Sequence, residues 1–325
     1  MLIVFPGQGS QKIGMGKDLY DRFQSARNVF HEVDDTLSFP LANLIFNGTE
    51  NELKATENAQ PALMAVSMAF VRVLEKEFAT DIVSKARFLA GHSLGEYTAL
   101  CAGGVISLAD AAKILRVRGE AMAKACPTEG SMAAILGLDI ETVERLVDEV
   151  HFENNELKSS KIVLQIANDN CSGQVVISGH ESAVARAMKK AQHCGARKTT
   201  MLEVSGPFHC QLMEDAAAAV EDVLAKITFH TPVRPIISNV NARAEIDGFD
   251  KLLLQQLTER VRWRETVLFA AANSVSECVE IGSGKVLSGL AKRICPQMIV
   301  TNINSISSLD EIVKMGKFSA TLSRI

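Results

Sequence analysis

Residues Gly91-His92-Ser93-Leu94-Gly95-Glu96 follow the apolar run 88–90 and lead into the apolar segment 97–102. A buried strand, a sharp turn and a helix with Gly-x-Ser-x-Gly at the turn are typical of a nucleophile elbow, which presents a serine hydroxyl above a sheet. The flanking glycines suit a turn so tight that a Cβ at either position would crowd it. The N–H of Leu94, the first free donor of the helix, points to where an oxyanion would form. The alternative is a turn whose serine only caps the helix, and this motif alone does not decide between the two.

The composition is that of a well-folded chain without an obvious ligand class. Of 325 residues, 47% are hydrophobic and 22% charged, which argues against disorder, and the net charge of -4 argues against general nucleic-acid binding. Apolar runs are too short to cross a membrane, and Met1 leads directly into the strand-like run 2–5, so we expect no signal peptide. The odd number of cysteines, without a C-x-x-C pair, argues against disulfides and zinc. We therefore expect a cytoplasmic protein that needs no metal.

A glycine-rich loop, residues 6–11, follows the first predicted strand. Its glycines fit neither Gly-x-Gly-x-x-Gly nor a phosphate-binding loop, so we reject nucleotide binding here. What remains is Gln8, a polar side chain between two glycines at the end of a strand, where α/β sheets bind ligands. The alternative is a solvated turn glutamine.

Arg118 falls on the apolar face of a predicted helix. The residues of this face recur at helical spacing and are Leu108, Ala111, Leu115, Arg118 and Met122. A guanidinium stays charged and is costly to bury alone, so it must meet an anion. That anion is either a structural Asp or Glu or the carboxylate of a substrate, and the spacing leaves both open.

Residues 131–202 interrupt the larger α/β pattern. Their predicted elements are strands at 132–136, 162–166, 174–177 and 198–202 and helices at 140–150 and 181–194, with a polar turn at 168–173. The order β-α-β-β-α-β is that of a ferredoxin-like unit. We therefore expect a small subdomain, 131–202, inserted into a large one made of 1–130 and 203–325.

His209 is the candidate base. It follows the turn Gly206-Pro207-Phe208 and precedes a predicted helix, 211–225. The chain order, nucleophile and then histidine, suits a serine–histidine pair. Most single histidines are structural or exposed, so the residues alone leave this role open.

Four motifs together resemble the malonyl-CoA:acyl carrier protein transacylases of bacterial fatty-acid synthesis. They are Phe5–Gln11, Gly91–Tyr97, Gly206–His209 and Glu280–Leu287, in the family's order, and the resemblance spans residues 4 to about 303. It implies an α/β fold, with an α/β-hydrolase-like large subdomain built on a mostly parallel sheet and a ferredoxin-like insert. Two positions depart from the family pattern: Ser283 replaces a usual proline, and Cys210 a frequent serine.

The resemblance also implies the roles of the site residues. They are Ser93 as acylated nucleophile, His209 as general base, Gln8 and Leu94 as oxyanion donors, Arg118 as partner of the malonyl carboxylate, and Gln256, through its carbonyl, with Asn170 nearby, as supports of the base. A base oriented by a carbonyl would explain why no triad acid is evident between Ser93 and His209.

The activity implied is transfer of malonyl from malonyl-CoA to the phosphopantetheine thiol of holo acyl carrier protein, by a ping-pong route through malonyl-serine. The coenzyme A thioester is a substrate, so we expect no cofactor, and we expect a monomer that binds neither nucleic acid nor membranes. Because carrier proteins are acidic, we expect a basic docking patch. The candidates, which could equally be ordinary solvated faces, are Lys189, Lys190, Arg197 and Lys198, or Lys285, Lys292 and Arg293.

Three alternatives remain. A serine esterase or thioesterase would share the elbow, but it predicts a buried Asp or Glu behind His209 and no need for Arg118. An acyltransferase of polyketide synthesis would take another extender unit, such as methylmalonyl. A non-catalytic docking module would not need Ser93, His209, Gln8 and Arg118 together.

Overall fold

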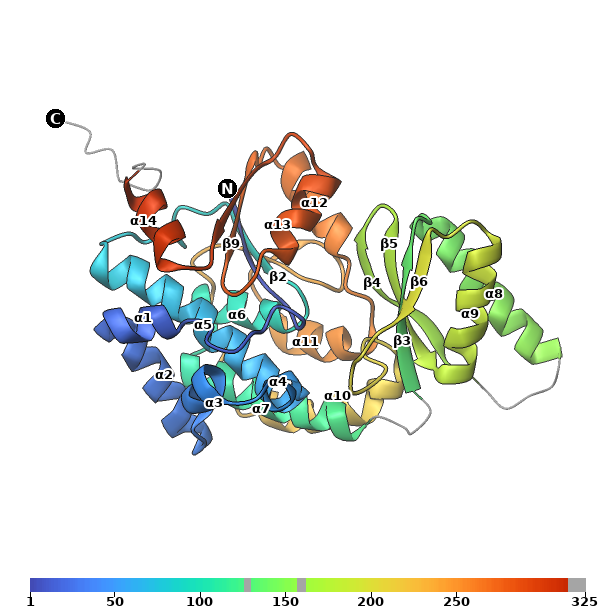
Figure 1. Cartoon of the computed structure of the whole chain (residues 1–325), viewed down its shortest axis with the longest axis horizontal. Coiled ribbons are helices and arrows are strands. Elements are labelled where there is room, and N and C mark those ends of the chain that lie inside the picture. Colours follow the sequence, from blue (N-terminus) through green and yellow to red (C-terminus); the bar gives the residue numbers. More distant parts are fainter. Residues whose placement is uncertain (126–129, 157–161, 315–325) are drawn as a thin grey trace.

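The computed structural model describes residues 1–125, 130–156 and 162–314, and in these ranges the larger sheet has six strands (Figure 1). Their order is β10 (Ile299–Ile303), β9 (Glu277–Ile281), β1 (Leu2–Phe5), β2 (Phe88–Gly91), β7 (Ile236–Ile237) and β8 (Ala244–Glu245). All neighbouring pairs are parallel except β7 with β8. The predicted α/β class with a mostly parallel sheet is confirmed.

Both faces of this sheet are covered by helices, as the uninterrupted apolar run of β1 requires. Ile3 and Phe5 belong to one core and Leu2 and Val4 to another, because alternate side chains of a strand point to opposite faces. Helices of the first core include α2 (Gln24–Leu37), α5 (Thr56–Glu77), α6 (Leu94–Ala102), α7 (Leu108–Lys124), α10 (Glu214–Leu224) and α11 (Phe249–Thr258). Helices of the second core are α12 (Trp263–Ala272) and α13 (Val286–Ile294).

Shorter helices complete the large subdomain. They are α1 (Lys17–Arg22), α3 (Leu41–Asn47), α4 (Glu50–Lys54), the 3-10 turn η1 (Gln211–Met213) and α14 (Ile306–Lys314). Among the helices of the described ranges, none has the length and hydropathy that a membrane crossing needs.

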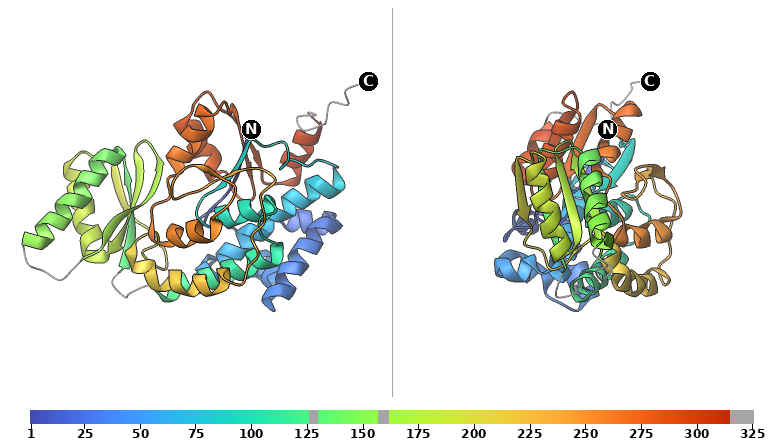
Figure 2. Two further views of the ribbon diagram at one scale, coloured as in Figure 1. Left: turned by 180° about the vertical axis from the view of Figure 1, so that it is seen from behind. Right: turned by 90° about the vertical axis from the view of Figure 1, so that its right-hand side faces the viewer.

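The second sheet is antiparallel and stands to one side of the large subdomain (Figures 1 and 2). The order of its described strands is β4 (Leu164–Cys171), β5 (Gln174–His180), β3 (Gly130–Leu136) and β6 (Lys198–Met201). Helices α8 (Ile140–Glu156) and α9 (Glu181–His193) share a separate core with this sheet. This is the predicted ferredoxin-like insert. The division at 130/131 and 202/203 stays a prediction.

The predicted polar turn at 168–173 is wrong. Residues 168–171 belong to strand β4, so only Ser172 and Gly173 of the predicted polar turn form the β4–β5 turn. The extension pairs with β5 on one side. On the other side, the N–H of Asp169 donates to the carbonyl of Val261 (3.0 Å), and the N–H of Val261 donates to that of Ala167 (2.8 Å). These bonds come from a distant part of the chain, and local polarity gave no sign of them.

Candidate active site

The turn between β2 and α6 holds Ser93 in a strained backbone conformation, with φ 53° and ψ −112°. A Cβ on Gly91 would lie 1.9 Å from the carbonyl carbon of Gly95, and one on Gly95 would lie 2.3 Å from the carbonyl oxygen of Phe5. The predicted crowding at both glycines is therefore confirmed. The turn is also held by Asn239, whose side chain accepts from the N–H of Ser93 (2.8 Å) and donates to the carbonyl of Gly91 (2.7 Å).

Ser93 and His209 meet although 116 positions separate them. The Ser93 hydroxyl lies 2.8 Å from Nε2 of His209, and Nδ1 of His209 lies 2.8 Å from the main-chain carbonyl of Gln256. A carbonyl only accepts, so Nδ1 carries the proton and Nε2 is free to accept one from Ser93. Burial, and then the positive charge of Arg118, lowers the pKa of His209 to about 3, so the imidazole is neutral near pH 7.

Arg118 is 1% exposed, and within the described residues its guanidinium hydrogen-bonds to neutral oxygen acceptors. Its Nη1 donates to Oε1 of Gln60 (2.7 Å), and its Nη2 donates to Oε1 of Gln256 (3.0 Å) and to the Ser93 hydroxyl oxygen (3.1 Å). The guanidinium also lies over the Tyr97 ring, 5.2 Å from its centroid. Within the described part of the chain Arg118 forms no ion pair, so the structural Asp or Glu partner considered above is not found.

Gln8 and Leu94 follow the carboxyl ends of two neighbouring parallel strands, β1 and β2. Strands β1 and β2 pair from Leu2↔Phe88 to Phe5↔Gly91, and this register brings the Gln8 loop beside the Ser93 turn. Nε2 of Gln8 donates to the Thr56 hydroxyl (3.3 Å) at the start of α5. Leu94 is the first residue of α6, so its N–H has no acceptor within the helix.

Asn170, expected near the base as a support, is hydrogen-bonded to His92. Its Oδ1 lies 2.9 Å from Nε2 of His92, so it contacts His92 and not His209. The His92 ring in turn packs against Trp263, with centroids 5.6 Å apart. Asn170 lies in strand β4 at a register shift between Asp169 and Cys171, where it has no paired residue on β5.

Ser93, His209 and Arg118 line a cavity of about 400 Å³ between the two subdomains. Its wall includes Gln8, Ser93 and Arg118 from the large subdomain and Met132, Asn168 and Leu202 from the insert or its end. The site therefore brings a serine hydroxyl, a neutral imidazole and a buried guanidinium together at one cavity. That combination suits the transfer of an acyl group that carries a negative charge.

Comparison with known proteins agrees with this chemistry. A sequence model described as an acyl transferase domain matches residues 2–294. The malonyl CoA-acyl carrier protein transacylase of Bacillus subtilis is 46% identical over 90% of this chain and 89% of its own, and that of Escherichia coli K12 is 38% identical over 94% and 96%. The chain belongs to the malonyl-CoA–acyl carrier protein transacylase family.

Solved structures of the transacylase family have the same fold. An acyl-carrier-protein S-malonyltransferase from Bartonella henselae superposes with a TM-score of 0.91 at 47% identity, covering 97% of this chain and 98% of its own. A malonyl-transacylase in complex with a type II polyketide acyl carrier protein superposes at 0.89 and 39% identity, covering 97% and 99%. This chain is accordingly an acyltransferase.

Three residues that touch the transacylase site were not predicted. Gln60 accepts a hydrogen bond from Arg118, and Asn239 accepts one from the N–H of Ser93. Glu96 accepts one from the side-chain amide of Gln256 (2.6 Å). Asn239 could have been found, because it follows the apolar residues of β7, and the ends of strands face the ligand edge of such a sheet. No local signal marks Gln60, whose role depends on how α5 packs on α7.

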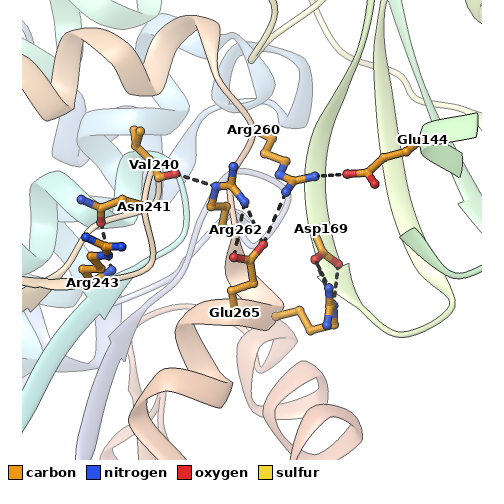
Figure 3. Close-up of polar contacts among 9 residues, drawn as sticks. Glu144, Asp169, Val240, Asn241, Arg243, Arg260, Arg262 and Glu265 are labelled. Carbon is orange, nitrogen blue, oxygen red and sulfur yellow. Dashed lines mark hydrogen bonds and ion pairs between the residues drawn. The ribbon is translucent and has the colours of Figure 1, made fainter. Parts of the chain in front are cut away.

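The two halves of the transacylase cavity are held together by residues 260–264 (Figure 3). Arg260 pairs with Glu144 of α8 at 2.7 Å, and Arg264 pairs with Asp169 of β4 at 2.9 Å. Val261, between them, forms a β-bridge with Asn168. Asp169 is 1% exposed, whereas Glu144 is 48% exposed, so the second pair is the better shielded of the two.

Proposed function

We propose that this protein transfers the malonyl group of malonyl-CoA to the phosphopantetheine thiol of holo acyl carrier protein through a malonyl ester of Ser93. The observation that carries the proposal is the state of Arg118, a fully buried cation bonded to neutral oxygens beside the nucleophile. A buried charge without a directly bonded counter-charge is costly, so the site is suited to an anion from outside the chain. The free carboxylate of malonyl is such an anion, placed two bonds from the thioester carbonyl.

In the first half-reaction the Ser93 oxygen attacks the thioester carbonyl while Nε2 of His209 takes the hydroxyl proton. Negative charge moves to the carbonyl oxygen, where the N–H of Leu94 and the side-chain amide of Gln8 are the proposed donors. Collapse of the tetrahedral intermediate breaks the carbon–sulfur bond, and His209 returns the proton to the coenzyme A sulfur. The product is malonyl-Ser93.

In the second half-reaction the carrier thiol takes the place of coenzyme A. Nε2 of His209 accepts the thiol proton, the sulfur attacks the ester carbonyl, and the proton returns to the Ser93 oxygen as the ester bond breaks. The carbonyl of Gln256 keeps the His209 tautomer the same in both halves. The chain thus supplies nucleophile, base and donors, and we propose that it needs no added cofactor.

Selection of malonyl follows from Arg118. An acetyl group would leave the guanidinium without an anion, and a site that offers a buried polar group discriminates strongly against an analogue lacking the partner. The hydrolase alternative expected a carboxylate behind His209 and no use for Arg118. A carbonyl lies there, which weighs against it.

We also propose that the protein acts as a cytoplasmic monomer. The six cysteines in the described ranges are all free thiols, which suits a reducing compartment. The proposed partners are malonyl-CoA and an acidic carrier protein, without nucleic acid or membrane.

The test is the mass of the intact protein after brief incubation with malonyl-CoA, acetyl-CoA or methylmalonyl-CoA. We expect one malonyl adduct, mapped to Ser93, absent from Ser93→Ala and lost when holo carrier protein is added. A methylmalonyl adduct formed as fast would favour the polyketide alternative. An adduct that disappears in plain buffer would favour the hydrolase, and one on Cys210 would overturn the assigned nucleophile.

A further inference from the structure

Gln256 touches each of the proposed reactive groups. Its main-chain carbonyl accepts from His209, its Oε1 accepts from Arg118 (3.0 Å), and its Nε2 donates to the carbonyl of Ser93 (3.1 Å). Residue 256 is 1% exposed, near the end of α11. The direction of its side-chain amide therefore decides whether an acceptor or a donor faces Arg118.

Glu96 fixes that direction. Its Oε2 accepts from Nε2 of Gln256 at 2.6 Å, the shortest bond that Gln256 makes, and from the N–H of Asn239 at 3.2 Å. Because Oε2 already accepts from the N–H of Asn239, it acts as an acceptor toward Gln256, so the amide nitrogen faces Glu96 and the amide oxygen faces Arg118. Glu96, together with the carbonyl of Ser93, thus binds the donor side of the Gln256 amide and leaves the acceptor side for Arg118.

Burial of the Glu96 carboxyl group costs free energy of folding. Glu96 is fully buried on α6, and its Oε1 has no hydrogen-bond partner in the described part of the structure. Burial raises the pKa of Glu96 to about 7, although the Gln256 bond and Arg118 act in the opposite direction. An acidic residue in the first turn favours a helix, but a buried one gains less from that than it loses in hydration. The bond from Asn239 supports the Ser93 turn, and the bond to Gln256 points to a second role within the site.

We propose that Glu96 is a positioning residue which, by orienting the Gln256 amide, holds Arg118 ready for the carboxylate of the acyl group. Its negative charge also offsets the guanidinium at one remove, without occupying the position that the substrate takes. This inference rests on the proposed function, because it assigns Glu96 to the same selectivity for malonyl over acetyl.

The test compares Glu96→Gln with the wild type in adduct formation from malonyl-CoA and from acetyl-CoA. Glutamine has the same shape but lacks the charge and presents both a donor and an acceptor. We expect kcat/KM for malonyl-CoA to fall about 10- to 100-fold, mainly through KM, the effect of losing one charged hydrogen bond. For acetyl-CoA we expect little change, so the ratio of the two values falls.

Glu280→Gln is the matched control. Glu280 is as deeply buried, but it accepts from the N–H groups of Leu287 and Ser288 at the start of α13 and touches none of the reactive residues. We expect it to lower stability without changing the ratio. An equal fall for both thioesters in Glu96→Gln, or an unchanged ratio, would overturn the proposal and make Glu96 structural.

Two further measurements keep the result unambiguous. In an Arg118→Ala background, Glu96→Gln should leave the ratio unchanged, because the group through which it acts is gone; a further fall would overturn the proposal. If Glu96→Gln does not fold, Glu96→Asp, which keeps the charge but is one methylene shorter, should show the same loss of ratio. A wild type without a malonyl adduct would overturn the proposed function, and this inference with it.

Discussion

At the scale of single residues, Nη2 of Arg118 donates both to the Ser93 hydroxyl oxygen and to the side-chain oxygen of Gln256. We predict that Arg118→Ala lowers kcat/KM for malonyl-CoA by about 100-fold or more, the cost of leaving the malonyl carboxylate without its charged partner. Acetyl transfer should be spared or improved. Adduct formation from the two thioesters measures both. Arg118→Lys is the control: it keeps the charge but loses the two-pronged geometry, so it should recover only part of the rate. Equal losses for both acyl groups would rule out the clamp.

The neutral state of His209 leads to a pH-dependent contribution to stability. Its pKa is lowered from 6.5 to about 3 by burial and by Arg118, so between these values the unfolded chain binds the proton and the folded chain does not. The free energy of unfolding must then decrease as pH falls below 6.5. From pH 7 to pH 5 we predict that the wild type loses about 2 kcal/mol more than His209→Asn. Urea unfolding at both pH values checks this, and equal losses would contradict a buried neutral histidine.

At the scale of elements, the Ser93 turn depends on contact between α6 and β1. We predict that Gly95→Ala destabilises the fold by several kcal/mol, about 2–4, and abolishes acylation, because the new Cβ would meet the Phe5 carbonyl at 2.3 Å. Gly289→Ala on α13 is the control. Its Cβ would meet nothing within 4 Å, so it should stabilise the helix by up to about 1 kcal/mol. Thermal unfolding and adduct formation measure both. A Gly95→Ala protein of normal stability would refute the packing argument.

The same scale shows what could be predicted from the sequence. The Ser93 turn and the ferredoxin-like order were predictable because strand, turn and helix each leave a local pattern. The end of β4 and the place of Asn170 were not, because the partner of that strand extension, Val261, is about 90 positions away. The contact of Gln60 with Arg118 was not predictable for a related reason, because it depends on the packing of α5 against α7. Contacts between distant elements leave no periodic signal.

At the scale of the whole molecule, the cavity depends on the pairs that join the insert to residues 260–264. We predict that Asp169→Asn lowers the free energy of unfolding by about 1–3 kcal/mol, since it leaves Arg264 facing an uncharged group in a shielded position. Glu144→Gln removes the other pair, which is half exposed on the glutamate side, and should cost about 1 kcal/mol or less. Chemical denaturation of the two variants side by side checks this. Equal costs would show that burial does not distinguish the pairs.

The insert enters and leaves the chain at neighbouring strands. Strands β3 and β6 pair from Ala133↔Met201 to Leu136↔Lys198, and a Cβ on Gly130 would lie 2.5 Å from the ring of Pro207, so the two crossing points are close. Ser93, His209 and Arg118 all lie outside the predicted insert, whereas Met132 and Asn168 inside it form part of the cavity wall. Recombination could therefore replace the insert as one continuous segment. Such an exchange would change the part of the cavity wall that the insert forms and would leave Ser93, His209 and Arg118 in place. Chimaeras between relatives should inherit their size preference from the donor of the insert.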